Sequence, residues 1–323
     1  MLANDYEAQL ILVLGESQGM MMIETREYPV DAALMLLNQM INIVILMIIL
    51  YSNFVSTTEV ENTTETEYHE KIAYGRYVYE PGAYPFYYSI QYPILSPTEG
   101  YVHVCSGALL GKRLMITAAH CLVNTSHIPL YRVLPNYRNT PLILPNDLVF
   151  KIEDYEIHPG ANQGIFPFKD DIAIVRLDQD DPRPGVNLLK PIIPLHRCLP
   201  VKMMGYGYTE SGDYPYRLKD ATVFLLSDEE CLDVLPYPIY IPISNICVSN
   251  SIGSAGCSGD SGGPLVLENP QNGKSYLYGV LTGGPDPCRQ SDMTTYVNVL
   301  VYLYWIDAAM LRLSRDELRS DSD

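Results

Sequence analysis

Short runs of β-branched and aromatic residues alternate with Pro, Gly and Asn turns through most of the chain after residue 100. These runs span residues 101–104, 109–116, 142–144, 172–177, 222–226, 265–267, 276–281 and 295–299. Many short strands separated by turns at this spacing are typical of sandwiches and barrels. The pattern therefore predicts an all-β fold for this part of the chain.

A different period appears near the C-terminus, in residues 301–313. Apolar side chains recur there at intervals of three and four residues, which places them on one face of a helix; they are Tyr302, Trp305, Ile306, Ala309 and Leu313. We expect a C-terminal α-helix that packs through this face. Residues 314–323 carry most of their side chains charged or polar, and we expect them to form an acidic tail.

The N-terminal residues show no strong period until an almost wholly apolar run at residues 41–50, interrupted only by Asn42. The run is followed by Val55-Ser56-Thr57, a small-residue pattern that suits signal-peptide cleavage. We therefore expect residues 1–39 to be a non-functional extension, Met40 to be the working start and residues 40–57 to be a signal peptide. The alternative is an uncleaved membrane anchor over residues 32–55, although its polar residues weigh against it.

Residues 58–71 are rich in Thr and Glu and poor in apolar side chains, which is the profile of a disordered spacer. This segment ends at Lys71.

The chain has 323 residues, 47% of them hydrophobic, which is ample material for a core. Its formal net charge is −17 and it has no block of basic residues. This charge argues against nucleic acid and anionic membrane surfaces as partners.

All seven cysteines follow residue 104, and none forms a Cys-x-x-Cys pair. That many cysteines without metal-ligand spacing indicate an oxidising compartment, and we expect neither a metal nor a cofactor. Two glycosylation sequons, at Asn62 and Asn124, agree with secretion.

Ser261 is the candidate nucleophile, because it lies in the glycine-rich segment 256–264, where the backbone can turn sharply and a substrate can approach closely. The bare Gly-x-Ser-x-Gly pattern also fits the nucleophile elbow of α/β-hydrolases, in which the histidine follows the serine. All six histidines precede Ser261, which excludes that order; they are His69, His103, His120, His127, His158 and His196. The base must therefore lie upstream.

His120 is the best candidate base, because it ends an apolar run in Thr117-Ala118-Ala119-His120-Cys121. An acidic pair, Asp170-Asp171, precedes the strand-like run 172–177. With Gly259-Asp260-Ser261-Gly262-Gly263-Pro264, these motifs resemble, in order, those of the chymotrypsin-like (trypsin-like) serine proteases. The resemblance covers about residues 72–310.

The resemblance implies a fold of two packed six-stranded antiparallel β-barrels, with the protease domain at residues 72–313. It implies a triad of His120, Asp171 and Ser261, in which His120 takes the serine proton and Asp171 orients the imidazole. The backbone N–H groups of Gly259 and Ser261 would form the oxyanion hole. Cleavage after Lys71, at the end of the acidic propeptide 58–71, would free the Ile72 ammonium to pair with Asp260.

Three disulfides are also implied by the resemblance: Cys105–Cys121, Cys231–Cys247 and Cys257–Cys288. Cys198 is left over, and we expect it to be buried. Seven positions are implied to line the substrate site: Ala255, Gly256, Ser258, Thr282, Gly283, Gly284 and Thr294. Ala255 stands where trypsin-like relatives place an Asp, so we expect a neutral pocket that prefers apolar side chains, narrowed by Thr294. Gly283 replaces a bulky aromatic residue, which would remove one wall.

These features favour a secreted serine endopeptidase, activated from a zymogen and acting through an acyl-enzyme. Its partners would be protein or peptide substrates, an activating protease and protein protease inhibitors, and the chain would be monomeric. Two alternatives stay open: a non-catalytic binding or regulatory protein on the same scaffold, and a membrane-anchored protease.

Overall fold

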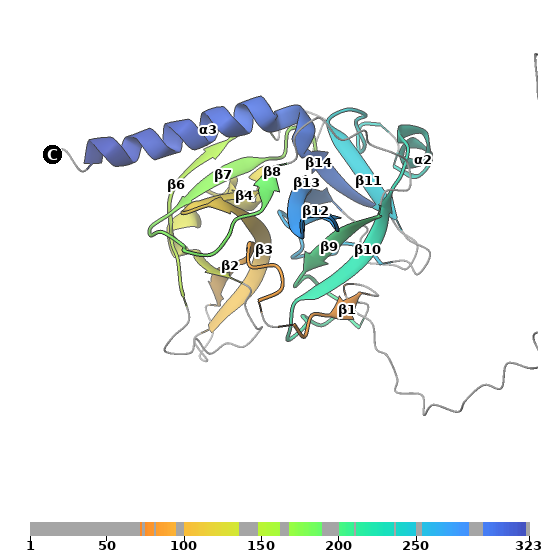
Figure 1. Cartoon of the computed structure of the whole chain (residues 1–323), viewed down its shortest axis with the longest axis horizontal. Coiled ribbons are helices and arrows are strands. Elements are labelled where there is room, and N and C mark those ends of the chain that lie inside the picture. Colours follow the sequence, from red (N-terminus) through yellow and green to blue (C-terminus); the bar gives the residue numbers. More distant parts are fainter. Residues whose placement is uncertain are drawn as a thin grey trace, which may run out of the picture. The chain divides into compact units, whose positions relative to one another are not determined.

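The structure, a computed structural model, describes residues 72, 75–80, 82–94, 100–135, 148–161, 168–188, 200–209, 211–235, 237–249, 254–283 and 293–320 (Figure 1). The predicted extension, signal peptide or anchor, and acidic propeptide, residues 1–71, lie outside this part of the chain. Within the described ranges, no helix has both the length and the apolar character that a bilayer crossing requires.

The first sheet consists of six antiparallel strands in the order β5-β2-β3-β4-β7-β6. Its strands are β2 (Tyr87–Ile94), β3 (Gly100–Gly111), β4 (Leu114–Thr117), β5 (Arg132–Pro135), β6 (Ile152–Ile157) and β7 (Ala173–Leu177). β4 and β7 are buried along their whole length, which explains their unbroken apolar runs. An isolated bridge between Val133 and Phe150 brings the β5 edge toward the start of β6.

The second sheet has the order β1-β10-β11-β14-β13-β12-β9, and β8 pairs with β13. Its strands are β1 (Arg76–Tyr77), β8 (Asn187–Leu188), β9 (Pro200–Gly205), β10 (Lys219–Leu225), β11 (Asn245–Ser249), β12 (Pro264–Asn269), β13 (Lys274–Gly283) and β14 (Thr294–Asn298). Because β9 also pairs with β10, the six strands β9 to β14 close into a barrel. The predicted all-β fold is therefore confirmed: the second sheet contains a closed six-stranded barrel, and the six strands of the first sheet form a half-barrel instead of a second closed barrel.

The C-terminal helix α3 (Val299–Ser320) lies across β6 and β7 of the first sheet (Figure 1). Its apolar face joins the core through Tyr302, Ile306, Ala309 and Leu313, as the period predicts. The helix continues to Ser320, so most of the predicted tail 314–323 is helical. This part contains neither Pro nor Gly, and a helix can extend into solvent where nothing breaks it.

The remaining helical elements are short: the 3₁₀ turns η1 (Ala119–Leu122) and η2 (Ile128–Leu130), and the helix α2 (Asp228–Val234). The Ser227 hydroxyl caps α2 by accepting from the Glu230 N–H, and the Glu230 carboxylate accepts from the Ser227 N–H. This reciprocal pair satisfies two donors that the first turn leaves without partners.

The two sheets meet where β3 contacts β12. At this junction the Ser106 N–H of β3 donates to the Ser261 carbonyl, 2.7 Å away, in the turn before β12. One buried core cluster includes residues of both sheets, such as Ile116 and Val266. The junction therefore holds the turn that carries Ser261 against β3 of the first sheet.

Candidate active site

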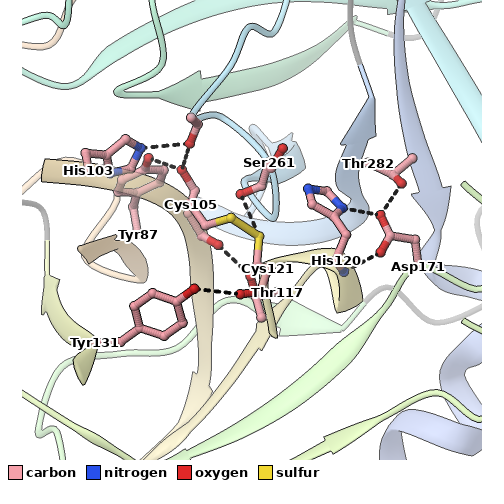
Figure 2. Close-up of a disulfide and its surroundings, with 12 residues drawn as sticks. Tyr87, His103, Cys105, Thr117, His120, Cys121, Tyr131, Asp171, Ser261 and Thr282 are labelled. Carbon is pink, nitrogen blue, oxygen red and sulfur yellow. Dashed lines mark hydrogen bonds and ion pairs between the residues drawn. A yellow bond between two sulfur atoms is a disulfide. The ribbon is translucent and has the colours of Figure 1, made fainter. Parts of the chain in front are cut away.

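His120 lies in η1, immediately after the buried strand β4. A disulfide between Cys105 and Cys121 ties η1 to β3, with an S–S distance of 2.02 Å. The Thr117 hydroxyl donates to the Ser106 carbonyl at 2.7 Å and adds a second connection to β3. The imidazole is thus held by a rigid turn (Figure 2). The His120 side chain is 33% exposed.

Asp171 is completely buried and precedes β7. Its Oδ1 accepts from the His120 backbone N–H at 2.8 Å, and its Oδ2 accepts from His120 Nδ1 at 2.7 Å (Figure 2). The Thr282 hydroxyl also donates to Oδ2. Because Asp171 only accepts, these bonds place a proton on Nδ1 and leave Nε2 as the basic nitrogen.

The pKa of His120 reflects two opposing effects. Burial lowers the pKa because it disfavours the imidazolium, whereas the hydrogen bond and the negative charge of Asp171 raise it. The net effect raises the pKa above its usual value. His120 is therefore a stronger base than a free histidine, as proton abstraction from a hydroxyl requires.

Asp170, the neighbouring acidic residue, has a different environment. Its backbone has a positive φ of 53°, and its carboxylate accepts from the Tyr302 hydroxyl of α3 at 2.5 Å. Asp170 therefore anchors α3, while Asp171 contacts His120, as the motif alignment implies.

Ser261 lies in a turn whose shape depends on glycine. Gly259 and Gly262 have φ values of 100° and 80°, a region that side-chain-bearing residues avoid. A Cβ on Gly262 would lie 2.3 Å from both the Ser106 carbonyl oxygen and the Thr117 hydroxyl. The turn can therefore pack against β3 and β4 only if this residue is glycine.

The ring nitrogen of His120 that does not bind Asp171 lies on the side of Ser261 (Figure 2). Between these two described residues the hydroxyl–imidazole hydrogen bond is not formed. Such bonds are often long without substrate and shorten when it binds. The arrangement brings together the three side chains of the implied triad, which come from η1, the segment just before β7 and the turn before β12.

The Gly259 carbonyl is fixed by a buried polar chain that the sequence analysis did not identify. His103 Nε2 and the Ser106 hydroxyl donate to this carbonyl at 2.7 and 3.2 Å, and Ser89 Oγ lies 2.7 Å from His103 Nδ1. Burial lowers the pKa of His103 to about 4, although its bond to Gly259 opposes the shift. His103 is thus a neutral donor that orients the peptide beside Ser261. A β-bulge in β3 explains why a period of two could not find it: Gln91 pairs with His103 and the next residue back, Ile90, with Cys105, so His103 shares its face with Ser106.

Asp260 is 1% exposed, and its carboxylate accepts from the N–H groups of Gly207 and Cys257 at 2.7 and 2.9 Å. Burial raises its pKa to about 6, while these bonds and the charge of Lys219 lower it. Within the described chain Asp260 forms no ion pair. Ile72, its implied partner, is buried in the core of the second sheet, and in the uncleaved chain its nitrogen belongs to the Lys71–Ile72 peptide bond and carries no charge.

The implied substrate pocket is neutral in the part that is described. Ala255 and Thr294 are completely buried, and the Gly256 N–H donates to the Thr294 hydroxyl at 2.8 Å. The Thr294 methyl group would lie 2.9 Å from a Cβ on Gly256. Ser258 is exposed, and Gly284 lies outside the described residues. Thr294 therefore packs against the segment that would form the pocket base.

The space beside Gly283 is filled by Phe168. A Cβ on Gly283 would lie 3.0–3.3 Å from three atoms of this ring, and the Asn245 side-chain amide donates to the Phe168 carbonyl at 3.0 Å. An aromatic ring from the segment before Asp171 therefore lies beside Gly283, and the loss of a wall of the substrate site stays a prediction.

The other implied features are only partly within the described chain. A disulfide joins Cys231 and Cys247, with an S–S distance of 1.96 Å. Cys257 is also disulfide-bonded, whereas Cys288 and Cys198 lie outside the described residues. Of the two sequons, Asn124 is exposed and Asn62 lies outside the described residues.

One cluster of possible metal ligands occurs among the described residues, formed by Cys105, His120 and Cys121. Its two sulfur atoms are joined to each other in a disulfide. They have no thiolate to offer, so the cluster does not fit a metal ion.

Comparison with known proteins agrees with this geometry. A family model described as Trypsin matches residues 73–306, more than half of the chain. The chain is 29% identical over 227 residues to urokinase-type plasminogen activator from Gallus gallus, 30% over 225 residues to protein masquerade from Drosophila melanogaster, and 31% over 216 residues to transmembrane protease serine 11G from Rattus norvegicus. Each alignment covers 64% of this chain but only 51%, 20% and 49% of the respective relative. The chain belongs to the trypsin family and contains a trypsin-like serine protease domain.

Proposed function

We propose that this chain is a serine endopeptidase in which Ser261 is the nucleophile and His120 the general base. The observation that carries the proposal is the environment of His120. Its Nδ1 and backbone N–H both bind the buried carboxylate of Asp171, and its second ring nitrogen is turned toward Ser261. A serine hydroxyl needs an adjacent base to become a useful nucleophile, and this arrangement supplies one.

In the proposed reaction the Ser261 oxygen attacks the carbonyl carbon of the scissile peptide while His120 Nε2 takes the hydroxyl proton. The N–H groups of Gly259 and Ser261 would stabilise the oxyanion, and loss of one such donor typically costs about 100- to 1000-fold in rate. His120 then gives the proton to the leaving amine, which forms the acyl-enzyme. Water deprotonated by His120 hydrolyses the ester and restores Ser261.

Activation is proposed to follow cleavage of the Lys71–Ile72 bond. The cut would convert the Ile72 nitrogen from an amide into an ammonium. Asp260 is a buried carboxylate without an ion pair in the described chain, so it would gain from such a charge. Movement of Asp260 toward the ammonium would order the neighbouring N–H groups of Gly259 and Ser261.

Specificity is proposed to favour apolar side chains before the scissile bond. A pocket based on Ala255 offers no counter-charge to Arg or Lys, and a buried charge without a partner costs several kcal/mol. An apolar side chain instead gains about 0.8 kcal/mol per buried methylene. The packing of Thr294 against Gly256 limits the depth available to large rings.

The cysteines, the disulfides and the exposed sequon at Asn124 support the proposal of a secreted protein, with retention through residues 32–55 as the alternative. Substrates, an activating protease and protein protease inhibitors are the proposed partners of a monomeric enzyme.

The experiment is limited trypsin cleavage of the full chain, followed by removal of the trypsin, N-terminal sequencing and assay on peptides that differ only before the scissile bond. We expect a new N-terminus at Ile72, hydrolysis after Leu or Phe, and an inactive Ser261→Ala chain that is cut in the same way.

More than a few per cent of activity in Ser261→Ala would overturn the catalytic assignment. Full activity of an uncut Lys71→Gln chain would overturn only the activation step. Inactivity of every cut form would instead favour a binding or regulatory protein.

A further inference from the structure

The helix α3 has a second apolar face, opposite the one that packs on the first sheet. Its residues are Val301, Tyr304, Ala308 and Leu311. Their spacing of three, four and three residues places them in one line along the helix. Ile306, at the centre of the buried face, is two residues from both Tyr304 and Ala308, and two residues span just over half a helical turn. A helix that is apolar on both sides is normally covered on both sides.

Solvent reaches the three larger side chains of this second face. Tyr304 exposes 89% of its surface, Leu311 58% and Val301 45%. Figure 1 shows β6 and β7 on one side of α3 and no described element on the other. Single exposed apolar residues are normal on a protein surface, whereas a continuous group of them marks a site for a partner.

Ile243 adds an exposed apolar residue beside the start of α3. Asn298, which precedes the helix, donates from its side-chain amide to the Ile243 carbonyl at 3.1 Å and from its backbone N–H to the Ser244 carbonyl at 2.9 Å. Ile243 is 73% exposed and has a φ of 75°, which a β-branched residue seldom adopts. The outer seam of α3 is defined here as Ile243, Val301, Tyr304, Ala308 and Leu311.

Charged residues flank the outer seam and make it narrow. Asp307 is exposed on one side of the line. Arg312 lies on the other side, where its Nε donates to the Glu156 carboxylate of β6 at 2.8 Å. A helix that lies on a lipid surface needs a broad apolar face. A narrow line of residues spaced by three and four is instead the pattern through which one helix packs on another.

The charge beside the outer seam selects among helical partners. Glu156 compensates Arg312, whereas Asp307 forms no ion pair within the described chain. The chain as a whole has a formal net charge of −17. A helix with basic residues beside its apolar line is therefore attracted, and a second copy of this acidic chain is repelled.

From this pattern we propose that the outer seam binds a basic amphipathic helix of another protein. Apolar side chains of that helix pack between Val301, Tyr304 and Leu311 as in a short coiled coil, and its basic side chains face Asp307. Ile243 packs against the end of the partner helix that lies near the start of α3. None of these residues belongs to the proposed catalytic site, so the proposal goes beyond the proposed function and does not depend on it.

The test measures binding of a helical peptide to the full chain with Ser261→Ala, which cannot hydrolyse the probe. The probe is a fluorescein-labelled peptide of three repeats of Leu-Ala-Ala-Leu-Lys-Ala-Lys, followed by fluorescence anisotropy. Its lysines flank the leucines and oppose pairing of the peptide with itself. Tyr304→Gln and Leu311→Gln should each weaken binding about five- to tenfold. Matched changes at exposed apolar positions outside the seam, Val123→Gln and Leu130→Gln, should alter binding by less than about twofold.

Two further controls separate the charged and apolar contributions. Asp307→Lys should weaken binding at least about threefold more than Asp233→Lys, which makes the same change of charge at an exposed position on α2. A probe with Gln in place of every Leu keeps its charge and should lose most of its binding. Equal effects of the seam and control variants would overturn the proposal, as would equal binding of the Gln probe.

Two other occupants of the outer seam would give different results. A second copy of the chain would give a dimer in sedimentation velocity without any probe, and Tyr304→Gln would abolish it. A lipid surface would give cosedimentation with phosphatidylcholine vesicles, which the same change would abolish. Either result without binding of the peptide would overturn the proposal. No step of this test involves hydrolysis, so failure of the proposed function would leave its result unchanged.

Discussion

Asp260 is expected to destabilise the uncleaved chain at neutral pH and to lose this effect once the activation site is cut. The perturbation is Asp260→Asn, made in a Ser261→Ala background so that the chain cannot digest itself. An asparagine keeps the size of the side chain but has no charge to bury. Comparing the two chains at several pH values therefore isolates the titration of Asp260.

The magnitude follows from the burial of this carboxylate. The folded pKa is about 6 and the ordinary value is 3.8, so between these pH values the folded chain binds a proton that the unfolded chain has released. Folding stability then falls as pH rises, by at most about 1.4 kcal/mol per pH unit. Between pH 5.0 and pH 7.5 the uncleaved aspartate chain should lose about 1.4 kcal/mol relative to the Asp260→Asn chain.

The assay is urea unfolding of both chains at pH 5.0, 6.0 and 7.5, before and after the cut at Lys71–Ile72. In the cut chain the Ile72 ammonium should lower the pKa of Asp260, because a nearby positive charge favours the carboxylate. In the cut form, the aspartate chain should then no longer lose stability relative to the Asp260→Asn chain between pH 5.0 and pH 7.5, or it should gain stability. The reasoning would be refuted if the free energy of unfolding had the same pH dependence in the two uncleaved chains. It would also be refuted if cutting the chain left the difference between them unchanged.

Asp171→Asn should lower kcat/KM by about 1000- to 10,000-fold without unfolding the cut chain, because the imidazole loses the acceptor that fixes its tautomer; kinetics on one peptide substrate measures this loss. Gly283→Trp should lower stability and activity by steric conflict with the Phe168 ring, and adding Phe168→Ala should restore both in thermal unfolding and peptide kinetics. Thr294→Gly should open the pocket base and raise kcat/KM for Phe relative to Leu before the scissile bond, measured on paired substrates.

The order of the sequence motifs and the regular spacing of short apolar runs predicted much of the fold and of the site. The alternation of short apolar runs and turns after residue 100 indicated strands, and the position of all six histidines before Ser261 excluded the α/β-hydrolase arrangement. These features are local in the chain or depend only on order. They could therefore be recognised without knowing how the sheets pack.

Features that depend on packing between distant segments were not predicted. The Phe168 ring fills the space beside Gly283, although the two residues lie 115 positions apart in the sequence. The bond from His103 to the Gly259 carbonyl joins β3 to the turn before β12 in the same way. The continuation of α3 to Ser320 was missed for a different reason, because the apolar period ends at Leu313 while the helix runs on without it.

The central claim, that His120 and Asp171 activate Ser261, is tested most directly by a fluorophosphonate, which reacts with an activated serine. The chain cut after Lys71 is treated with the reagent, and the modified peptide is located by mass spectrometry. We expect one adduct per chain, on Ser261, with labelling strongly slowed in His120→Ala. A cut chain with Ile72 at its N-terminus that stays unlabelled, or that is labelled equally fast without His120, would contradict the account.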